Sequence, residues 1–255
     1  MRGLDNKVAV VTGGSGAIGR SICRRFAEEG THIGIFDINE ESALETVQLI
    51  ESSGGKASAY KVDITDYAAV KKSKEIFEDE AGSTDILINN AGWDRLVNFL
   101  DTKPTFWDQI ISINLVGALN MHHIFLPSMV SNGTGKIVNI ASDAGRVGSS
   151  GEAVYSACKG GIIAFTKTLA REVAKTGICC NVVAPGPIDT PLLRSMTPDG
   201  NLDAGLGKAF KRAIPMRRIG EPDDIPGIVA FLSSSEADYI TGQVISVSGG
   251  LTMHG

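Results

Sequence analysis

The 255-residue chain lacks the features that define several classes of protein. It has only four cysteines, Cys23, Cys158, Cys179 and Cys180, and no two of them have C-x-x-C spacing. Few cysteines without paired spacing are typical of reduced thiols in a cytoplasmic protein. No cluster of His, Cys, Asp or Glu has the spacing of metal ligands, so we expect no metal site.

Charge and hydropathy exclude further classes. The formal net charge is −5, so no overall positive field favours nucleic acid. The sequence shows no apolar run of about 18–20 residues, which a membrane span needs. The first residues lack the apolar core of a signal peptide. We therefore expect a cytoplasmic protein with a small-molecule substrate and with no nucleic-acid or membrane partner.

The remaining pattern is a regular alternation of strands and helices. Short β-branched runs predict seven strands, at residues 7–11, 32–36, 56–61, 85–88, 136–140, 178–183 and 243–247. Amphipathic stretches such as 17–29, 40–53 and 66–80 separate them. Strands separated by helices predict an α/β fold, a Rossmann-like, doubly wound parallel sheet with helices on both faces. With no repeat and no linker, residues 1–255 are interpreted as one domain.

One segment interrupts this rhythm. Residues 190–220 separate the sixth strand from the helix that opens near residues 221–224. An insertion beside the carboxyl ends of parallel strands often covers a substrate. We therefore expect a substrate lid at about 190–220, with a pair of fixed surface helices as the alternative.

The stretch TGGSGAIG, residues 12–19, follows the first strand and opens a helix. Glycines allow a tight turn and a close approach to a pyrophosphate, and the helix offers free N–H groups and the positive end of its dipole. A lone G-x-G-x-x-G is weak evidence. This one lies between a strand and a helix, and Asp37 ends the second strand, so we interpret it as a dinucleotide site.

Asp37 also favours NAD over NADP. A carboxylate there accepts hydrogen bonds from the adenine-ribose hydroxyls of NAD and repels the additional phosphate of NADP. No Arg or Lys occupies residues 13–18, and Ile38 follows Asp37, so no cation is placed to offset this repulsion. A helix cap is the alternative role for this residue.

Tyr155 and Lys159 are four positions apart and therefore share one face of a helix. The pKa of a free tyrosine is about 10, too high for a base at neutral pH. We expect the ammonium of Lys159 and the charge of oxidised nicotinamide to lower it. Tyr155 would then exchange a proton with the substrate oxygen while the cofactor exchanges hydride.

Two polar residues complete the expected catalytic set. Ser142 ends the fifth strand, where its hydroxyl can bind the substrate oxygen; a turn-forming role is the alternative. Asn114 lies inside a helical pattern over residues 106–121, where asparagine is a poor choice. A polar role, such as holding a water near Lys159, would explain it.

Together these residues resemble the short-chain dehydrogenases/reductases over nearly the whole chain. The matching pieces are TGGSGAIG, Asp37, residues 62–64 (VDI), residues 89–92 (NNAG), the four catalytic candidates and residues 185–190 (PGPIDT). The resemblance implies a catalytic tetrad of Asn114, Ser142, Tyr155 and Lys159, and a homotetramer. It also implies that Asp63 contacts adenine, that Asn90 lies along the cofactor, and that Ile188 and Thr190 hold the nicotinamide amide.

The full set of cofactor contacts expected from the phosphate turn and the resemblance is Gly13, Ser15, Gly16, Ala17, Ile18, Gly19, Asp37, Asp63, Ile64, Asn90, Ala91, Gly92, Tyr155, Lys159, Pro185, Gly186, Ile188 and Thr190. One position departs from the family pattern. The family usually has glycine where this chain has Ala17. Gly16 could supply flexibility one position earlier, and a methyl at 17 is tolerable if the backbone there is already helical.

Several stretches, including residues 141–155 and 240–255, resemble those family members that oxidise a cyclic 2-hydroxyacyl-CoA to its 2-oxo form. Besides Ser142 and Tyr155, the expected substrate contacts are Trp93, Arg146, Glu152 and Met196. For each of these residues the alternative is a structural role, in packing or in bracing a loop. The stretch 208–218 holds five cations and no acid, and could meet CoA phosphates or simply be solvated.

Three other functions stay open. A 3-oxoacyl-thioester reductase or a general secondary-alcohol dehydrogenase would use the same scaffold. A cofactor-binding sensor without turnover is the third, and the complete set of four catalytic residues argues against it. His122 and His123 are adjacent and splay apart on a helix, so core or interface roles are expected of them rather than a metal site.

Overall fold

The computed structural model describes residues 1–253, apart from the side chain of residue 198. Its centre is a seven-stranded sheet in which every neighbouring pair is parallel, in the order β3-β2-β1-β4-β5-β6-β7. The predicted α/β fold is confirmed, and each predicted strand end lies within two residues of the observed one. The strands are β1 (Val8–Thr12), β2 (His32–Asp37), β3 (Lys56–Lys61), β4 (Ile86–Asn89), β5 (Gly135–Ile140), β6 (Ile178–Pro185) and β7 (Val244–Val247).

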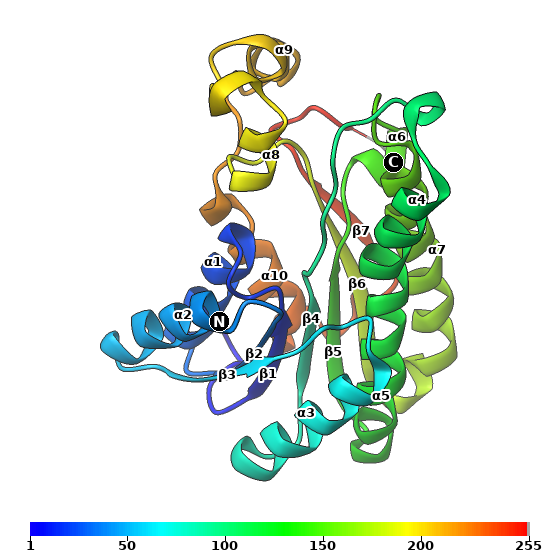
Figure 1. Cartoon of the computed structure of the whole chain (residues 1–255). Helices are drawn as coiled ribbons and strands as arrows, with labels where there is room; N and C mark the ends of the chain where they lie inside the picture. Colours follow the sequence, from blue (N-terminus) through cyan, green and yellow to red (C-terminus); the bar gives the residue numbers. More distant parts are fainter. Residues whose placement is uncertain (254–255) are drawn as a thin grey trace.

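Helices cover both faces of the sheet (Figure 1). One face packs against α1 (Ala17–Glu28), α2 (Glu40–Ser52) and α10 (Pro226–Ser233), the other against α3 (Tyr67–Ala81), α5 (Gly117–Asn132) and α7 (Ala153–Val173). Side chains of β1 alternate between the two buried clusters: Ala9 and Val11 join the first, Val8 and Val10 the second. Burial on both faces explains the continuous apolar runs of the strands.

The helical pattern over 106–121 proves to be three segments. The helix α4 (Pro104–Ile111) continues through a π-helical turn (Ser112–Val116) into α5. By length and hydropathy alone this 29-residue stretch could cross a membrane, contrary to the expectation that the sequence holds no such run. Its buried residues Met121, Ile124, Phe125 and Met129 instead pack on the sheet as a core helix.

The strand order reverses between β1 and β4, and the ends of these two strands are tied together. The hydroxyl of Thr12, the last residue of β1, accepts hydrogen bonds of 3.0 Å from the N–H groups of Asn90 and Ala91. The side chain of Asn90 donates back to the carbonyls of Thr12 and Gly13. Ligands of open parallel sheets bind at such a reversal, beyond the carboxyl ends of the strands.

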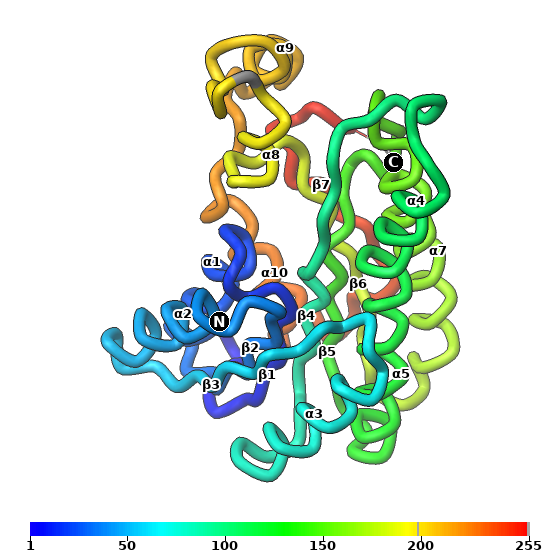
Figure 2. The backbone as a smooth tube through the Cα atoms, viewed as in Figure 1, coloured from blue at the N-terminus to red at the C-terminus, as the bar shows by residue number. Residues whose placement is uncertain are grey.

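The segment 190–220 contains α8 (Pro191–Ser195), a 3-10 turn (Pro198–Gly200) and α9 (Gly205–Ala213). Figures 1 and 2 show this arm extending past the carboxyl ends of the strands, away from the two main layers of helices. A short helix, α6 (Ala144–Val147), lies at the same end of the molecule between β5 and α7. The position suits a substrate lid, and its movement stays a prediction.

Candidate active site

The turn after β1 is built for a phosphate, and two glycines are indispensable to it. Gly13 has a φ of +63°, and its N–H donates to the carbonyl of Phe36 on β2. A Cβ on Gly19 would lie 2.1 Å from the carbonyl oxygen of Gly13, so a side chain there is impossible without moving the turn. The backbone can therefore fold closely around the start of α1, where free N–H groups favour an anion.

The departure at Ala17 is harmless for a simple reason. Gly16 is the residue before the helix, with φ −68° and ψ 163°, and Ala17 is the first residue of α1. The backbone at 17 is thus already helical, as the sequence argument requires. Gly16 itself has an ordinary extended conformation, and a Cβ added to it would meet only the carbonyl oxygen of Gly13, at 3.4 Å, so the residue does not supply special flexibility.

Asp37 ends β2 and is almost completely buried, at 7% exposure. One carboxylate oxygen accepts a 2.9 Å hydrogen bond from the N–H of Ser15 in the phosphate turn, and the other accepts one of 2.9 Å from Asn39. The nearest arginine of the turn, Arg20, is bonded to Thr46 and Glu45 on α2. The carboxylate is therefore fixed in place beside the turn.

The other adenine-side candidates lie at the ends of β3 and β4. Asp63 is exposed and accepts from the N–H and hydroxyl of Thr65, at 2.9 and 2.7 Å. Ile64 is buried, and its side chain packs where a Cβ on Gly117 would stand. Because the side-chain amide of Asn90 is occupied by β1, this residue shapes the cofactor groove mainly by positioning the turn.

The segment after β6 forms the opposite wall. Pro185 ends the strand, and Gly186 donates to the carbonyl of Val247 on β7. Ile188 is buried and pairs with Gly220, which joins the two ends of the 190–220 arm. Thr190 caps α8 by accepting from the N–H of Leu193. These residues hold the base of the arm beside the nicotinamide position expected from the resemblance.

The catalytic candidates Ser142, Tyr155 and Lys159 come together at the carboxyl end of β5. Ser142 lies beside Tyr155, close enough to lower the pKa of the phenol. The Nζ atom of Lys159 lies 5.4 Å from the centre of the Tyr155 ring and donates a 3.1 Å hydrogen bond to the carbonyl of Ile140. Tyr155 is partly exposed, whereas Lys159 is only 4% exposed. The Tyr155 side chain is thus accessible in part, whereas the Lys159 ammonium beside it is buried.

The expectation that Lys159 lowers the pKa of Tyr155 is wrong when only the protein groups are considered. Burial raises the pKa of Tyr155, and the carboxyl groups of Glu152 and Asp94 raise it further, while the contact with Ser142 lowers it. Burial also lowers the pKa of Lys159 to about 8. Local spacing in the sequence does not place these two acids near the phenol. Among the protein groups only the contact with Ser142 lowers this pKa, and the positive charge of a bound oxidised nicotinamide would lower it further.

Asn114 lies within the π-helical turn and is 2% exposed. Its amide nitrogen donates to the carbonyls of Trp93 and Ile110, at 2.7 and 3.0 Å, and its oxygen accepts from the N–H of Trp93. A Cβ added to Gly92 would lie 2.9 Å from the Asn114 oxygen and 3.2 Å from Lys159 Nζ, so these groups adjoin. Asn114 therefore fixes the loop after β4 next to the lysine.

These residues fit a nicotinamide dinucleotide. The phosphate turn is a cradle that a Cβ on Gly19 would destroy, and a carboxylate stands at the end of β2. Residues 13–19 and Asp37 would hold the phosphate and ribose end, and Tyr155, Lys159 and residues 185–190 the nicotinamide end. In the described residues 1–253 no group of three or more His, Cys, Asp or Glu side chains is arranged to hold a metal ion.

The four further substrate candidates are placed differently. Glu152 lines a narrow depression together with Tyr155. Trp93 packs edge-to-face on Phe106, with ring centres 6.4 Å apart. Arg146 donates a 2.8 Å bond to Ser246 on β7, which supports the bracing role. Met196 is half-buried at the end of α8 in the arm.

Three of the five cations in the stretch 208–218 are bound to groups of the arm or of the turn that directly follows it. Lys211 pairs with Asp203 and Arg218 with Asp224, and Arg217 donates to the carbonyl of Arg212. These contacts favour the solvated alternative over a CoA-phosphate site. The two histidines also separate as expected: His122 is buried among Asn89 and Asn139, and His123 is exposed on Tyr67.

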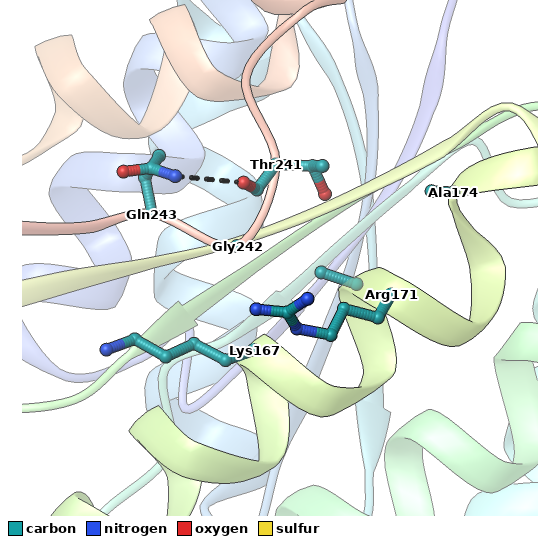
Figure 3. Close-up of a pocket in the computed structure, with 7 residues that line it drawn as sticks. Lys167, Arg171, Ala174, Thr241, Gly242 and Gln243 are labelled. Carbon is teal, nitrogen blue, oxygen red and sulfur yellow. Dashed lines mark hydrogen bonds between the residues drawn. The ribbon is translucent and has the colours of Figure 1, made fainter.

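The depression beside Tyr155 includes residues that were not among the sequence predictions. Asp94, Val97, Phe99, Thr102 and Phe106 line it. The signal was present in the polar Asp94 directly after Trp93, but no spacing rule links it to Glu152. Another hollow lies between α7 and the start of β7, where Lys167 and Arg171 face Thr241 and Gln243 (Figure 3). It involves none of the expected site residues.

Fold and site define a nicotinamide-dependent oxidoreductase. A family model described as enoyl-(acyl carrier protein) reductase matches residues 13–252. The chain belongs to the short-chain dehydrogenase/reductase family and acts on CH–OH groups.

Individual relatives are similar to this chain over nearly its whole length. The chain is 36% identical over 250 residues to a 3-oxoacyl-[acyl-carrier-protein] reductase of Thermotoga maritima, covering 98% of this chain and 99% of that one. It is 38% identical over 249 residues to the protein of the same name from Staphylococcus epidermidis, covering 97% and 100%. A crystal structure of NAD+-bound xylitol dehydrogenase superposes with a TM-score of 0.90 at 30% identity, covering 97% and 99%.

Proposed function

We propose that this protein is an NAD-dependent dehydrogenase that interconverts a 3-hydroxyacyl thioester and the corresponding 3-oxoacyl thioester. The observation that carries the chemistry is the Tyr155 phenol, with Ser142 beside it and the buried Nζ of Lys159 at 5.4 Å from the centre of its ring. A phenol held in this way can exchange a proton with a substrate oxygen.

Two resemblances support a thioester. Relatives named 3-oxoacyl-[acyl-carrier-protein] reductase cover nearly the whole chain. Residues 141–155 and 240–255 resemble 2-hydroxycyclohexanecarboxyl-CoA dehydrogenase. In that ring substrate the hydroxyl is on the carbon β to the thioester carbonyl, so both substrates place the reacting carbon in the same relation to the thioester. The relatives favour the 3-oxoacyl thioester, the alternative in our sequence analysis, over the ring compound.

Each of the four catalytic candidates has a separate role in the oxidation. Ser142 holds the substrate hydroxyl, and Tyr155 takes its proton as the C=O bond forms. The cofactor, when bound, supplies the acceptor for the hydride that leaves the carbinol carbon. Lys159 lies beneath the phenol, and Asn114 keeps the loop after β4 against it. Reduction runs through the same groups in reverse.

NAD is proposed over NADP because of Asp37. Its buried carboxylate stands beside the phosphate turn, where it would meet the adenine ribose. A 2′-phosphate there would be repelled. The NAD+-bound xylitol dehydrogenase, with a TM-score of 0.90, supports the same choice.

The test is a substrate panel followed at the absorbance of NADH. We expect a 3-hydroxyacyl thioester and 2-hydroxycyclohexanecarboxyl-CoA to exceed simple secondary alcohols in kcat/KM, with NAD better than NADP. Equal rates on simple alcohols would overturn the thioester proposal. A homotetramer, expected from the family, is tested separately by sedimentation.

A further inference from the structure

A hollow lies at the far end of α7, between this helix and the loop that leads into β7 (Figure 3). Its volume is about 470 Å³, which is within the range of small-molecule sites in proteins. It is lined by Lys167, Ala170, Arg171, Ala174, Thr241, Gly242 and Gln243. We call the space between these seven residues the basic hollow.

The basic hollow is separate from the active site. Lys159 and Arg171 are 12 positions apart on α7, which corresponds to about 18 Å along a helix axis. Lys159 is bonded to the carbonyl of Ile140, at the carboxyl end of β5, whereas the loop 241–243 precedes β7 and lies at the amino ends of the strands. A compound in the hollow is therefore neither the reacting substrate nor the nicotinamide.

The two cations of the hollow have no acidic partner. Within residues 1–253, neither Lys167 nor Arg171 forms an ion pair. Asp238, three positions before the loop, is paired with Lys136 at 2.7 Å, and Glu172 points about 100° away from Arg171 around the helix. Like charges four positions apart on a helix repel each other, and an anion bound between them would remove this repulsion.

The loop on the opposite wall adds neutral donors. Thr241 Oγ1 accepts a 3.1 Å hydrogen bond from the N–H of Cys180, which leaves its own proton to donate. The side-chain amide of Gln243 donates one hydrogen to the Thr241 carbonyl, at 3.1 Å, and retains a second. A Cβ on Gly242 would lie 3.6 Å from that of Ala170, so the loop packs directly on α7. Donors thus stand on both walls, and the described residues that line the hollow include no acid.

We propose that the basic hollow binds a small molecule through a phosphate or pyrophosphate group. The guanidinium of Arg171 can donate two parallel N–H bonds to phosphate oxygens, and Lys167 adds a point charge. A carboxylate presents two oxygens in one plane. The oxygens of a phosphate are tetrahedral and can meet donors of the helix and of the loop at once. The proposal is independent of which alcohol the enzyme oxidises.

The test is a calorimetric titration of the NADH-saturated protein with inorganic pyrophosphate, at constant ionic strength. NADH fills the phosphate turn after β1, and its fluorescence shows that it stays bound. We expect saturable binding with one site per chain. Lys167→Gln and Arg171→Gln should each weaken this binding at least about tenfold, because each removes a charged donor. Malonate, which has two carboxylates and no phosphate, should bind at least about tenfold more weakly than pyrophosphate.

A matched control separates the hollow from a general effect of charge. Lys72→Gln makes the same charge change at an exposed position of α3 and should leave the affinity for pyrophosphate unchanged. Lys167 and Arg171 are exposed, so both of their variants should fold and bind NADH as the wild type does. Three results would each overturn the proposal: no saturable binding to the wild type, an affinity that neither variant alters, or equal affinities for malonate and pyrophosphate. None of these measurements uses a hydroxyacyl substrate, so the outcome does not depend on the proposed function.

Discussion

The N–H of Ser15 donates a 2.9 Å hydrogen bond to a carboxylate oxygen of Asp37. This contact joins the phosphate turn after β1 to the residue at the end of β2. The same side chain therefore positions the turn and, in the proposed function, selects the cofactor. A change at Asp37 acts on both.

Asp37→Asn should shift the cofactor preference toward NADP. It removes the charge that repels a 2′-phosphate and weakens charge-assisted bonds worth about 1.5–3 kcal/mol, so kcat/KM for NAD should fall about tenfold or more. Steady-state kinetics with both cofactors measure the ratio. Asp79→Asn, an exposed acid on α3, serves as the control. An unchanged ratio at Asp37 would contradict the role assigned to it.

Two glycines of one turn should respond oppositely to alanine. Gly19→Ala places a methyl against the Gly13 carbonyl, so it should distort the turn and weaken NAD binding at least about tenfold. Gly16→Ala adds a methyl 3.4 Å from that oxygen at an ordinary φ, so it should bind within about threefold of wild type. Titration by NADH fluorescence measures both. Equal losses in the two variants would show that the turn is not formed as described.

Tyr155→Phe should abolish proton exchange while leaving the site folded. The expected loss of kcat is about 10²–10⁴-fold, the usual contribution of a general acid or base. NADH binding should persist, because most of the expected contacts lie elsewhere. Tyr67→Phe, a change to an exposed tyrosine bonded to His123, should retain activity. Substantial turnover by the Tyr155→Phe protein would exclude the mechanism.

His122 should make the protein less stable in mild acid. Burial lowers its pKa from 6.5 to about 4, although a bond to the Ala118 carbonyl opposes this. Between these pH values the unfolded chain holds one more proton, so the free energy of unfolding should decrease as pH falls from about 6.5 to about 4. The expected contribution is on the order of 3 kcal/mol.

Denaturant titrations over this pH range test the effect. His122→Gln should show a shallower decrease than wild type, because the titrating ring is gone. His123→Gln alters the exposed neighbour and leaves the buried ring in place, so it should keep the wild-type slope. A wild-type slope in the His122→Gln protein would assign the acid sensitivity to other groups.

The sheet was predictable because parallel strands buried on both faces have a strong apolar signal. The phosphate turn was predictable for a different reason: only glycine at 13 and 19 permits the backbone path, so the sequence must show it. Lys159 and Tyr155 were found through helical spacing, which is a local property.

Contacts between loops that are far apart in the sequence could not be predicted. Asp94 and Glu152 are separated by 58 positions and follow different elements, so no periodicity links them. Their effect on the pKa of Tyr155 has the opposite sign to the one expected from Lys159 alone. Ser246 on β7, which accepts a hydrogen bond from Arg146, is also remote from it in sequence.

The hydrophobic period over residues 106–121 predicts one continuous helix and does not reveal the π-helical turn at Ser112–Val116. A π-helical turn holds an additional residue compared with an α-helical one. Here it carries Asn114, whose amide bonds to the backbone at Trp93 and Ile110. Deleting one residue of the turn would let the helix continue with regular α-helical geometry. Asn114 would then lose its hydrogen bonds to the loop at Trp93, and we expect the activity to fall with them.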